Sequence, residues 1–171
     1  GEDLIFNARD GGIYYWDTSA DTLGTDRGTA LSDLAGADAG TPTLAKQVLV
    51  SDRDRHIIAV GCDAADSLGT LDPLLIRFSS QESATIWDPE VENSAGDLRV
   101  GAGTQIICAI ETRRNVLIFT DVSVHSMQYL GPPFTFGIDQ LSENTTIAGP
   151  LAAKAVDDMV FWMGIEEFYI Y

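Results

Sequence analysis

Residues 115–129 read NVLIFTDVSVHSMQY, and this stretch decides the fold class. An apolar run at residues 115–119 is followed by Thr120-Asp121 and then by a second run at residues 122–129. β-Branched and aromatic residues dominate both runs, and a short polar break between such runs is typical of two strands joined by a turn. The stretch therefore predicts paired antiparallel strands.

Runs of the same kind recur along the chain, separated by turn residues such as Asp10-Gly11-Gly12 and the polar stretch 51–55. The further predicted strands are residues 4–6, 13–16, 47–50, 56–61, 74–78, 84–87, 98–100, 104–110, 152–156, 159–163 and 168–171. Helical periodicity is missing from the sequence apart from one turn expected around residues 29–35. These patterns predict an all-β chain.

Four segments form a degenerate internal repeat. With Phe6, Ile58, Ile118 and Phe161 as anchors, the spacings are 52, 60 and 43 residues. Repeats of roughly 40–50 residues built of short strands are typical of propeller blades. We predict β-propeller-like repeats of short antiparallel strands, and a β-sandwich is the alternative that the spacing does not exclude.

Two Trp-Asp pairs, at residues 16–17 and 87–88, invite comparison with WD repeats. No Gly-His pair precedes either one, and their separation of 71 residues is longer than one blade of a WD-repeat propeller. We interpret them as propeller-like strand ends.

Residues 17–45 differ in character from the strand runs. They are rich in Asp, Thr, Ala and Gly, and small residues of this kind fill a core poorly. We predict a long loop or insertion that protrudes from a β domain spanning residues 1–171. Its scattered leucines need a place to be buried, so they are the candidate subunit contacts: Leu23, Leu31, Leu34 and Leu44.

The charge balance limits the partners. Asp and Glu number 26 against 10 Lys and Arg, a formal net charge of −16. Residues 1–98 hold 18 acids and 6 bases, net −12, and residues 99–171 hold 8 acids and 4 bases, net −4. A surface this negative repels phosphate, so tight nucleic-acid binding is disfavoured.

The sequence carries no recognisable enzyme motif, so we expect no catalytic residues, no cofactor and no metal. HExxH, GxSxG and CxxC are all missing, and His56 and His125 stand 69 residues apart in apolar runs, where a structural role is expected. Asp52 and Asp54 have the spacing of two calcium ligands. However, Arg53 and Arg55 alternate with them, and the Gly and Glu that complete a calcium-binding loop do not follow. A glycosidase would need two carboxylates that face each other across a cleft, and the sequence alone does not tell which carboxylates lie close together in space.

Other features concern compartment and completeness. Cys62 and Cys108 end apolar runs, and both are expected to be buried, reduced thiols. No apolar run approaches 18 residues, so no membrane span is predicted. The chain opens on Gly1 and ends in the apolar strand pattern FYIY, which indicates a fragment of a larger protein.

Several segments together resemble the tail nozzle proteins of short-tailed bacteriophages, also called tail tubular or stabilisation proteins. The matching segments cover most of residues 41–171: PTLAKQVLVSDRDRHIIAVG (42–61), PLLIRFSSQESATIWDPEVENSAGDLRVGAGTQI (73–106), NVLIFTDVSVHSMQYLGPPFTF (115–136) and FWMGIEEFYIY (161–171). Residues 17–40 show no such resemblance. The family pattern expects Asp-Gly after the final Tyr, which this chain lacks.

The resemblance implies a β-propeller-based virion protein that forms a homo-oligomeric ring, a hexamer in the family, below the head-to-tail adaptor. Such a ring conducts and retains genomic DNA without binding it tightly, and it docks to the adaptor and to tail fibres or spikes. The expected location is the virion tail, assembled in the cytoplasm of a bacterial host. An acidic lumen would suit this role, because each phosphate contact would add friction.

Two other functions stay open at this point. The chain could be another virion structural protein, such as a baseplate, fibre-attachment or capsid-associated protein that shares the domain. A propeller carbohydrate-active enzyme is the third hypothesis, and it would need convergent carboxylates in a central pocket.

Overall fold

The computed structural model describes residues 3–19 and 27–171, and within these ranges the chain forms fourteen strands and one short 3₁₀ helix. The expected all-β class is confirmed. The elements are β1 (Leu4–Asn7), β2 (Gly11–Trp16), β3 (Thr29–Ala30), η1 (Leu31–Asp33), β4 (Leu44–Val50), β5 (Ile57–Cys62), β6 (Leu75–Phe78), β7 (Gly96–Arg99), β8 (Ile106–Glu111), β9 (Val116–Thr120), β10 (Ser123–Gly131), β11 (Thr135–Glu143), β12 (Ala153–Val156), β13 (Met159–Met163) and β14 (Phe168–Ile170).

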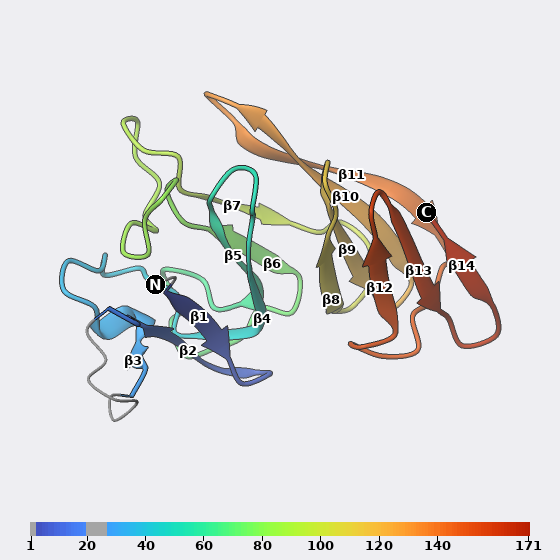
Figure 1. Ribbon diagram of the computed structural model, residues 1–171, viewed down its shortest axis with the longest axis horizontal. Coiled ribbons are helices and arrows are strands. Elements are labelled where there is room, and N and C mark those ends of the chain that lie inside the picture. Colours follow the sequence, from blue (N-terminus) through green and yellow to red (C-terminus); the bar gives the residue numbers. More distant parts are fainter. Residues whose placement is uncertain (1–2, 20–26) are drawn as a thin grey trace.

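The strands form three antiparallel sheets that follow one another along the chain (Figure 1). The first sheet has the order β1-β2-β4-β5-β6-β7, with β3 paired to β2. The second sheet is the meander β8-β9-β10-β11, and the third is β12-β13-β14. The β1–β2 hairpin and the third sheet lie towards opposite ends of the long axis of the molecule (Figure 1).

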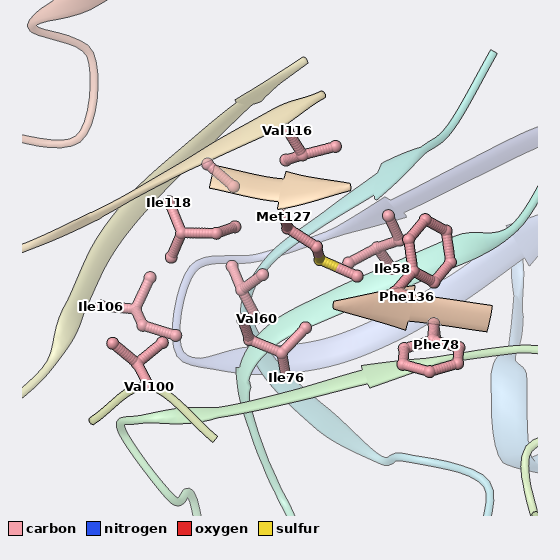
Figure 2. Packing of buried hydrophobic residues seen from close by; sticks show 11 residues of the cluster. Ile58, Val60, Ile76, Phe78, Val100, Ile106, Val116, Ile118, Met127 and Phe136 are labelled. Carbon is pink, nitrogen blue, oxygen red and sulfur yellow. The ribbon is translucent and has the colours of Figure 1, made fainter. Parts of the chain in front are cut away.

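Strands β5 and β9 are buried on both faces, as their continuous apolar sequences require. Ile58 on one face of β5 and Ile118 on one face of β9 meet in a cluster between the first and second sheets (Figure 2). Phe78 and Phe136 close this cluster, with ring centroids 4.9 Å apart in an edge-to-face arrangement. This cluster joins the first two sheets face to face.

The opposite faces of β5 and β9 have partners as well. Ile57 and Ala59 of β5 lie in a second cluster with Ile13 of the β1–β2 hairpin. Phe119 of β9 packs against Trp162 of the third sheet, with ring centroids 5.2 Å apart. The molecule is therefore a series of packed layers: the β1–β2 hairpin, strands β4–β7, the second sheet and the third sheet.

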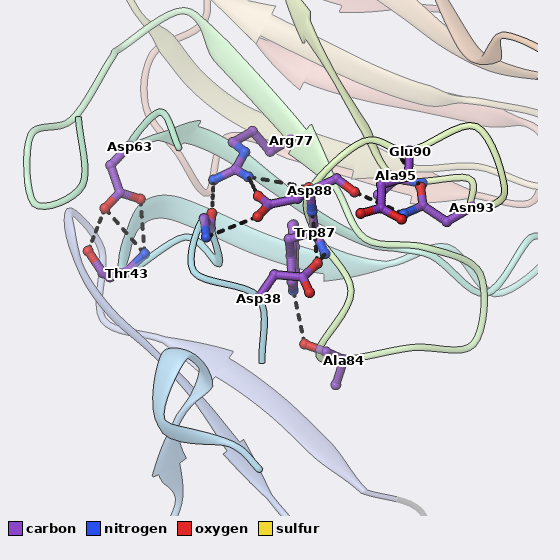
Figure 3. A network of polar contacts seen from close by, with 11 residues as sticks. Asp38, Thr43, Asp63, Arg77, Ala84, Trp87, Asp88, Glu90, Asn93 and Ala95 are labelled. Carbon is purple, nitrogen blue, oxygen red and sulfur yellow. Dashed lines mark hydrogen bonds and ion pairs between the residues drawn. The ribbon is translucent and has the colours of Figure 1, made fainter. Parts of the chain in front are cut away.

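Long loops are tied to the first sheet by buried polar contacts (Figure 3). The side chain of Arg77, 4% exposed, donates to the carbonyl oxygens of Gly40 at 2.6 Å and Trp87 at 3.3 Å. Trp87 is fully buried, and its indole Nε1 donates to the Ala84 carbonyl at 2.9 Å. Buried Asp63 accepts from the backbone N–H groups of Thr43 and Gly69 and from the Thr43 hydroxyl. These bonds satisfy groups that would be costly to bury alone.

The repeat anchors do not occupy equivalent places. Ile118 and Phe161 lie in the second strand of their sheets, β9 and β13, but Ile118 is fully buried and Phe161 is 44% exposed. Ile58 lies in β5, the fourth strand of the first sheet, and Phe6 lies in its edge strand β1. The described sheets do not close into a barrel, their face-to-face packing is consistent with a β-sandwich-like fold, and the propeller arrangement is not confirmed.

Two details of the expected strand pattern are corrected. Residues 84–87 form no strand, because the Ser83 hydroxyl accepts from the N–H groups of Thr85 and Ile86 and holds them in a turn. Trp87 therefore lies in a loop, and Trp16 alone of the two Trp-Asp pairs ends a strand. Strand β11 lies outside the predicted strand ranges, and it pairs with β10 along most of its length.

Candidate assembly surface

The outer face of the third sheet is apolar and exposed. In β13 the residues alternate, so that Val160 and Trp162 are buried towards the second sheet while Met159, Phe161 and Met163 point to the other side. Cross-strand pairing extends this side over the neighbouring strands, because Met163 pairs with Phe168, Phe161 with Ile170, and Met159 with Val156. We call this surface the β13 face; its apolar residues are Val156, Met159, Phe161, Met163, Phe168 and Ile170.

The exposed fractions show how open the β13 face is. Met159, Phe161 and Met163 are 44–45% exposed, Ile170 is 60% exposed and Phe168 is 83% exposed. Large apolar side chains that lie side by side on one sheet are costly in water, and contiguous patches of this kind mark interaction sites. The β13 face therefore has the chemistry of an unfilled packing surface.

The border of the β13 face is acidic. Asp157 and Asp158 lie in the β12–β13 turn, and Glu166 and Glu167 lie before β14. Lys154 of β12 pairs with Phe161, so this cation stands on the β13 face itself. Arg113 and Arg114 of the β8–β9 turn pair with Asp157 at 2.8 Å and Asp158 at 3.7 Å. These exposed ion pairs add little stability, but they fix the turn of the third sheet beside that of the second.

A smaller apolar surface lies on the β1–β2 hairpin. Leu4, Phe6 and Tyr14 are 47%, 40% and 38% exposed, and the rings of Phe6 and Tyr14 stack with centroids 5.6 Å apart. Leu4 and Phe6 share one face of β1 and Tyr14 is opposite Phe6 on β2, so the three side chains form one patch. We call it the hairpin patch. The other side of the hairpin, with Ile5, Ile13 and Tyr15, packs into the molecule.

A third exposed apolar feature is the tip of the β10–β11 hairpin, where Leu130 is 60% and Phe134 is 73% exposed. The tip is a narrow turn through Pro132 and Pro133, and its two apolar side chains make a much smaller surface than the β13 face. The β13 face is therefore the best candidate for assembly.

Three of the four leucines expected to contact a neighbouring subunit lie in the described residues, and these three do not form an outer surface. Leu31 is fully buried in the cluster beneath the β1–β2 hairpin, and Leu34 packs against the same cluster. Leu44 begins β4 opposite Gly12, and Leu23 lies outside the described residues. For Leu31 the expected subunit contact is corrected, because its own chain covers it completely.

The described part of residues 17–45 also packs more closely than a protruding loop. Gly40, Thr41 and Pro42 are buried, and the expected turn near residues 29–35 is the 3₁₀ helix η1. The Asp38 carboxylate accepts from the N–H groups of Trp87 and Asp88 at 2.7 and 3.0 Å, which ties this segment to the loop between β6 and β7.

The histidines and cysteines lie inside the structure. The Nδ1–H of His56 donates to the Ser79 carbonyl oxygen at 2.7 Å, and the His56 ring packs edge-on to Phe136. His125 Nε2 lies 2.8 Å from the Ser123 hydroxyl, both residues are buried, and burial lowers the pKa of His125. Cys62 and Cys108 are free and buried, as expected, and they lie in different clusters.

A polar concavity lies at the charged turns that follow β4, β8 and β12. It is lined by Asp52, Arg53, Glu111, Thr112, Arg113 and Asp157. Burial raises the pKa of Glu111, although its carboxylate accepts from the Asp52 backbone N–H at 2.8 Å. Charges of both signs alternate here, and the described residues include no group of three His, Cys, Asp or Glu side chains that could hold a metal ion. Across the same ranges, no helix is long and apolar enough to cross a membrane.

Comparison with family models and with curated proteins gives no match to this chain. The sequence did contain a signal for the β13 face: every residue from Met159 to Met163 is apolar, which is typical of a strand covered on both sides. What the sequence does not reveal is which of the two sides its own chain leaves open.

Proposed function

We propose that this chain is a structural virion protein, part of a ring-forming nozzle in the tail of a short-tailed bacteriophage. In this role it conducts and retains genomic DNA and docks to the head-to-tail adaptor and to fibres or spikes. The observation that carries the structural role is the β13 face, a row of apolar side chains 44–83% exposed on a regular sheet. Such a face needs a covering partner, and assembly supplies one.

The family resemblance supports the same proposal from another direction. Its segments fall on the framework of the sheets: residues 42–61 hold β4 and β5, residues 73–106 hold β6 and β7, and residues 115–136 hold β9 and β10. The resemblance therefore concerns the strands that build the layers and the turns between them.

The net charge favours a conduit that does not bind the DNA passing through it. A net charge of −16 repels the DNA backbone, so DNA can move past without the salt-dependent contacts that basic proteins make. We expect no retention of duplex DNA by the protein in a gel-shift or polarisation assay at low salt. Tight, salt-sensitive binding would contradict the conduit proposal.

The test of the proposed function is the position of the protein in the particle. Cryo-electron microscopy of the virion, or antibody labelling of its surface, should place the protein in the tail directly below the head-to-tail adaptor. Density at a baseplate, on a fibre attachment site or on the capsid would favour the alternative of a different virion protein. Failure to find the protein in purified particles would overturn both.

A further inference from the structure

We infer that the free edge of β14 pairs with an extended segment of another polypeptide, which adds a fourth strand to the third sheet. The segment carries apolar residues at alternate positions and polar residues between them. The inference goes beyond the proposed function and does not depend on it, because it concerns backbone hydrogen bonds at one edge of a sheet. Figure 1 shows β14 as an outer strand of the third sheet, with β13 between it and β12.

The other sheets indicate where the added strand belongs. Strands β4–β7 of the first sheet and strands β8–β11 of the second are meanders of four consecutive strands, and β12–β14 continue with three. The first strands of these meanders follow one another in space, because β4 lies against β8 and β8 lies against β12. The fourth strands β7 and β11 also lie against each other. A strand beside β14 would continue this second series.

The backbone of β14 is open along this edge. Tyr171 and Val160 of β13 exchange both backbone hydrogen bonds, at 2.9 and 3.0 Å. Alternate residues of an antiparallel strand direct their N–H and C=O groups to the same neighbour, so Tyr169 also bonds to β13 while Phe168 and Ile170 point theirs to the free edge. No strand among the described residues pairs with this edge. Such a row of unpaired backbone groups is the template to which extended peptides add.

The inner side of the open position is polar. A hollow between the second and third sheets is lined by Tyr171, Gln128 of β10 and residues of the adjoining turns: Thr112, Arg114, Asn115 and Asp158. Tyr171 points towards the second sheet, because its hydroxyl accepts from the Asn115 side-chain amide at 3.4 Å. Gln128 and Asp139 are exposed on the side of the second sheet that faces the third. A strand beside β14 would lie over these polar groups.

These surroundings define the chemistry of the partner segment. Its residues opposite Phe168 and Ile170 would lie on the β13 face, where apolar side chains match. Its residues opposite Tyr169 and Tyr171 would point into the polar hollow, where Thr, Asn or Gln can form hydrogen bonds. Every described strand of this chain already belongs to a sheet, so we assign the added strand to a different polypeptide.

A synthetic peptide tests the edge. The probe is the fluorescein-labelled peptide Thr-Val-Thr-Val-Thr-Val-Thr-Lys, and the control has the same composition in the order Thr-Thr-Thr-Thr-Val-Val-Val-Lys. Fluorescence polarisation should show binding of the alternating peptide at least about tenfold tighter than that of the control, because only the alternating order places all valines on one side. Hydrogen exchange followed by NMR should show that the peptide slows exchange of the Phe168 and Ile170 amides at least about tenfold.

Substitutions locate the binding edge. Ile170→Pro removes an outward N–H from β14 and should weaken binding of the alternating peptide at least about tenfold. Ala155→Pro is the matched control, because the N–H of Ala155 points to the free edge of β12, and it should leave binding unchanged. Gln128→Trp fills the hollow without altering β14, and it should also weaken binding. Urea unfolding midpoints show whether each variant is folded.

Three results would overturn the inference. The first is no binding of the alternating peptide up to about 1 mM. The second is equal binding by the wild type and a folded Ile170→Pro or Gln128→Trp variant. The third is protection of the Phe168 and Ile170 amides that rises with protein concentration without peptide, which would place a second copy on the edge. None of these results bears on the position of the protein in a virion, so failure of the inference and failure of the proposed function are distinguishable.

Discussion

Asp38 and Trp87 are 49 residues apart in the sequence, and the Asp38 carboxylate accepts a hydrogen bond from the Trp87 backbone N–H at 2.7 Å. The same oxygen accepts from the Asp88 N–H at 3.0 Å (Figure 3). One carboxylate therefore joins the segment before β4 to the loop between β6 and β7, which carries the fully buried Trp87 side chain.

Removing this carboxylate should destabilise the fold. Asp38→Ala leaves two N–H groups without their acceptor, and we expect it to lower the free energy of unfolding by about 1–3 kcal/mol. Asp38→Asn keeps an acceptor oxygen and should lose less. Urea denaturation followed by tryptophan fluorescence measures both, and an alanine variant as stable as the wild type would show that the two loops are held in another way.

A second prediction concerns the close approach of β7 to β6. A Cβ atom at Gly96 would lie 2.6 Å from Cζ of the buried Phe78 ring. Gly96→Ala should therefore force the core between the first two sheets to shift, at a cost of about 1–3 kcal/mol. Gly101→Ala is the matched control, because a Cβ atom there meets no atom within 4 Å. Equal unfolding midpoints for the two variants would contradict the steric argument.

Glu111 should make stability depend on pH. Burial raises its pKa in the folded protein, and nearby Asp52 and Asp54 act in the same direction. The folded state therefore holds the proton more tightly than the unfolded state, so the stability that this group contributes is present below the unfolded pKa and is lost as pH rises through the folded pKa.

Glu111→Gln keeps an oxygen for the Asp52 N–H but cannot ionise. We expect the variant to be more stable than the wild type near pH 7, and the difference to disappear near about pH 3, where the carboxyl is protonated in both states. Urea midpoints at the two pH values check this. A variant that is less stable at neutral pH would show that the charged form of Glu111 is favoured in the fold.

The two thiols should be inert in the folded protein. Burial raises the pKa of Cys62 to about 12, and burial likewise raises the pKa of Cys108 to about 12. The thiolate is the reactive form, so a thiol reagent near pH 8 should label neither residue until denaturant is added, when both react. Rapid labelling before unfolding would mean that one of the clusters opens readily.

The sequence predicted the layers better than it predicted the loops between them. Residues 47–50, 56–61 and 115–119 were identified as strands because their apolar and β-branched runs carry a local signal, and β4, β5 and β9 confirm them. Residues 84–87 have a similar composition but form no strand. Their backbone N–H groups donate to the side chains of Ser83 and the distant Asp38 in place of a neighbouring strand. A contact between residues 49 positions apart cannot be predicted from the composition of either segment.

Strand β11 and the open side of β13 illustrate two further limits. In β11, Gly137, Asp139 and Gln140 interrupt the alternation of apolar and polar residues, so the composition does not predict a strand. Pairing with β10 stabilises the strand instead. In β13, an apolar residue at every position indicated burial on both sides, but the identity of the covering surface depends on tertiary packing and assembly. The expected burial of Leu31 in a neighbouring subunit was wrong for the same kind of reason, because the chain covers this side chain itself.

The layered arrangement has a consequence for how the molecule opens. The buried clusters join the first sheet to the second and the second to the third, so each layer depends on its immediate neighbours. The third sheet has three strands and one neighbour, whereas β5 and β9 are enclosed on both sides. Amide hydrogens of β13 and β14 should exchange with deuterium well before those of β5 and β9, and a partner on Phe161 and Phe168 should slow that exchange selectively. The exchange rate of the amide hydrogens in the third sheet would then show whether the outer face of this sheet is covered.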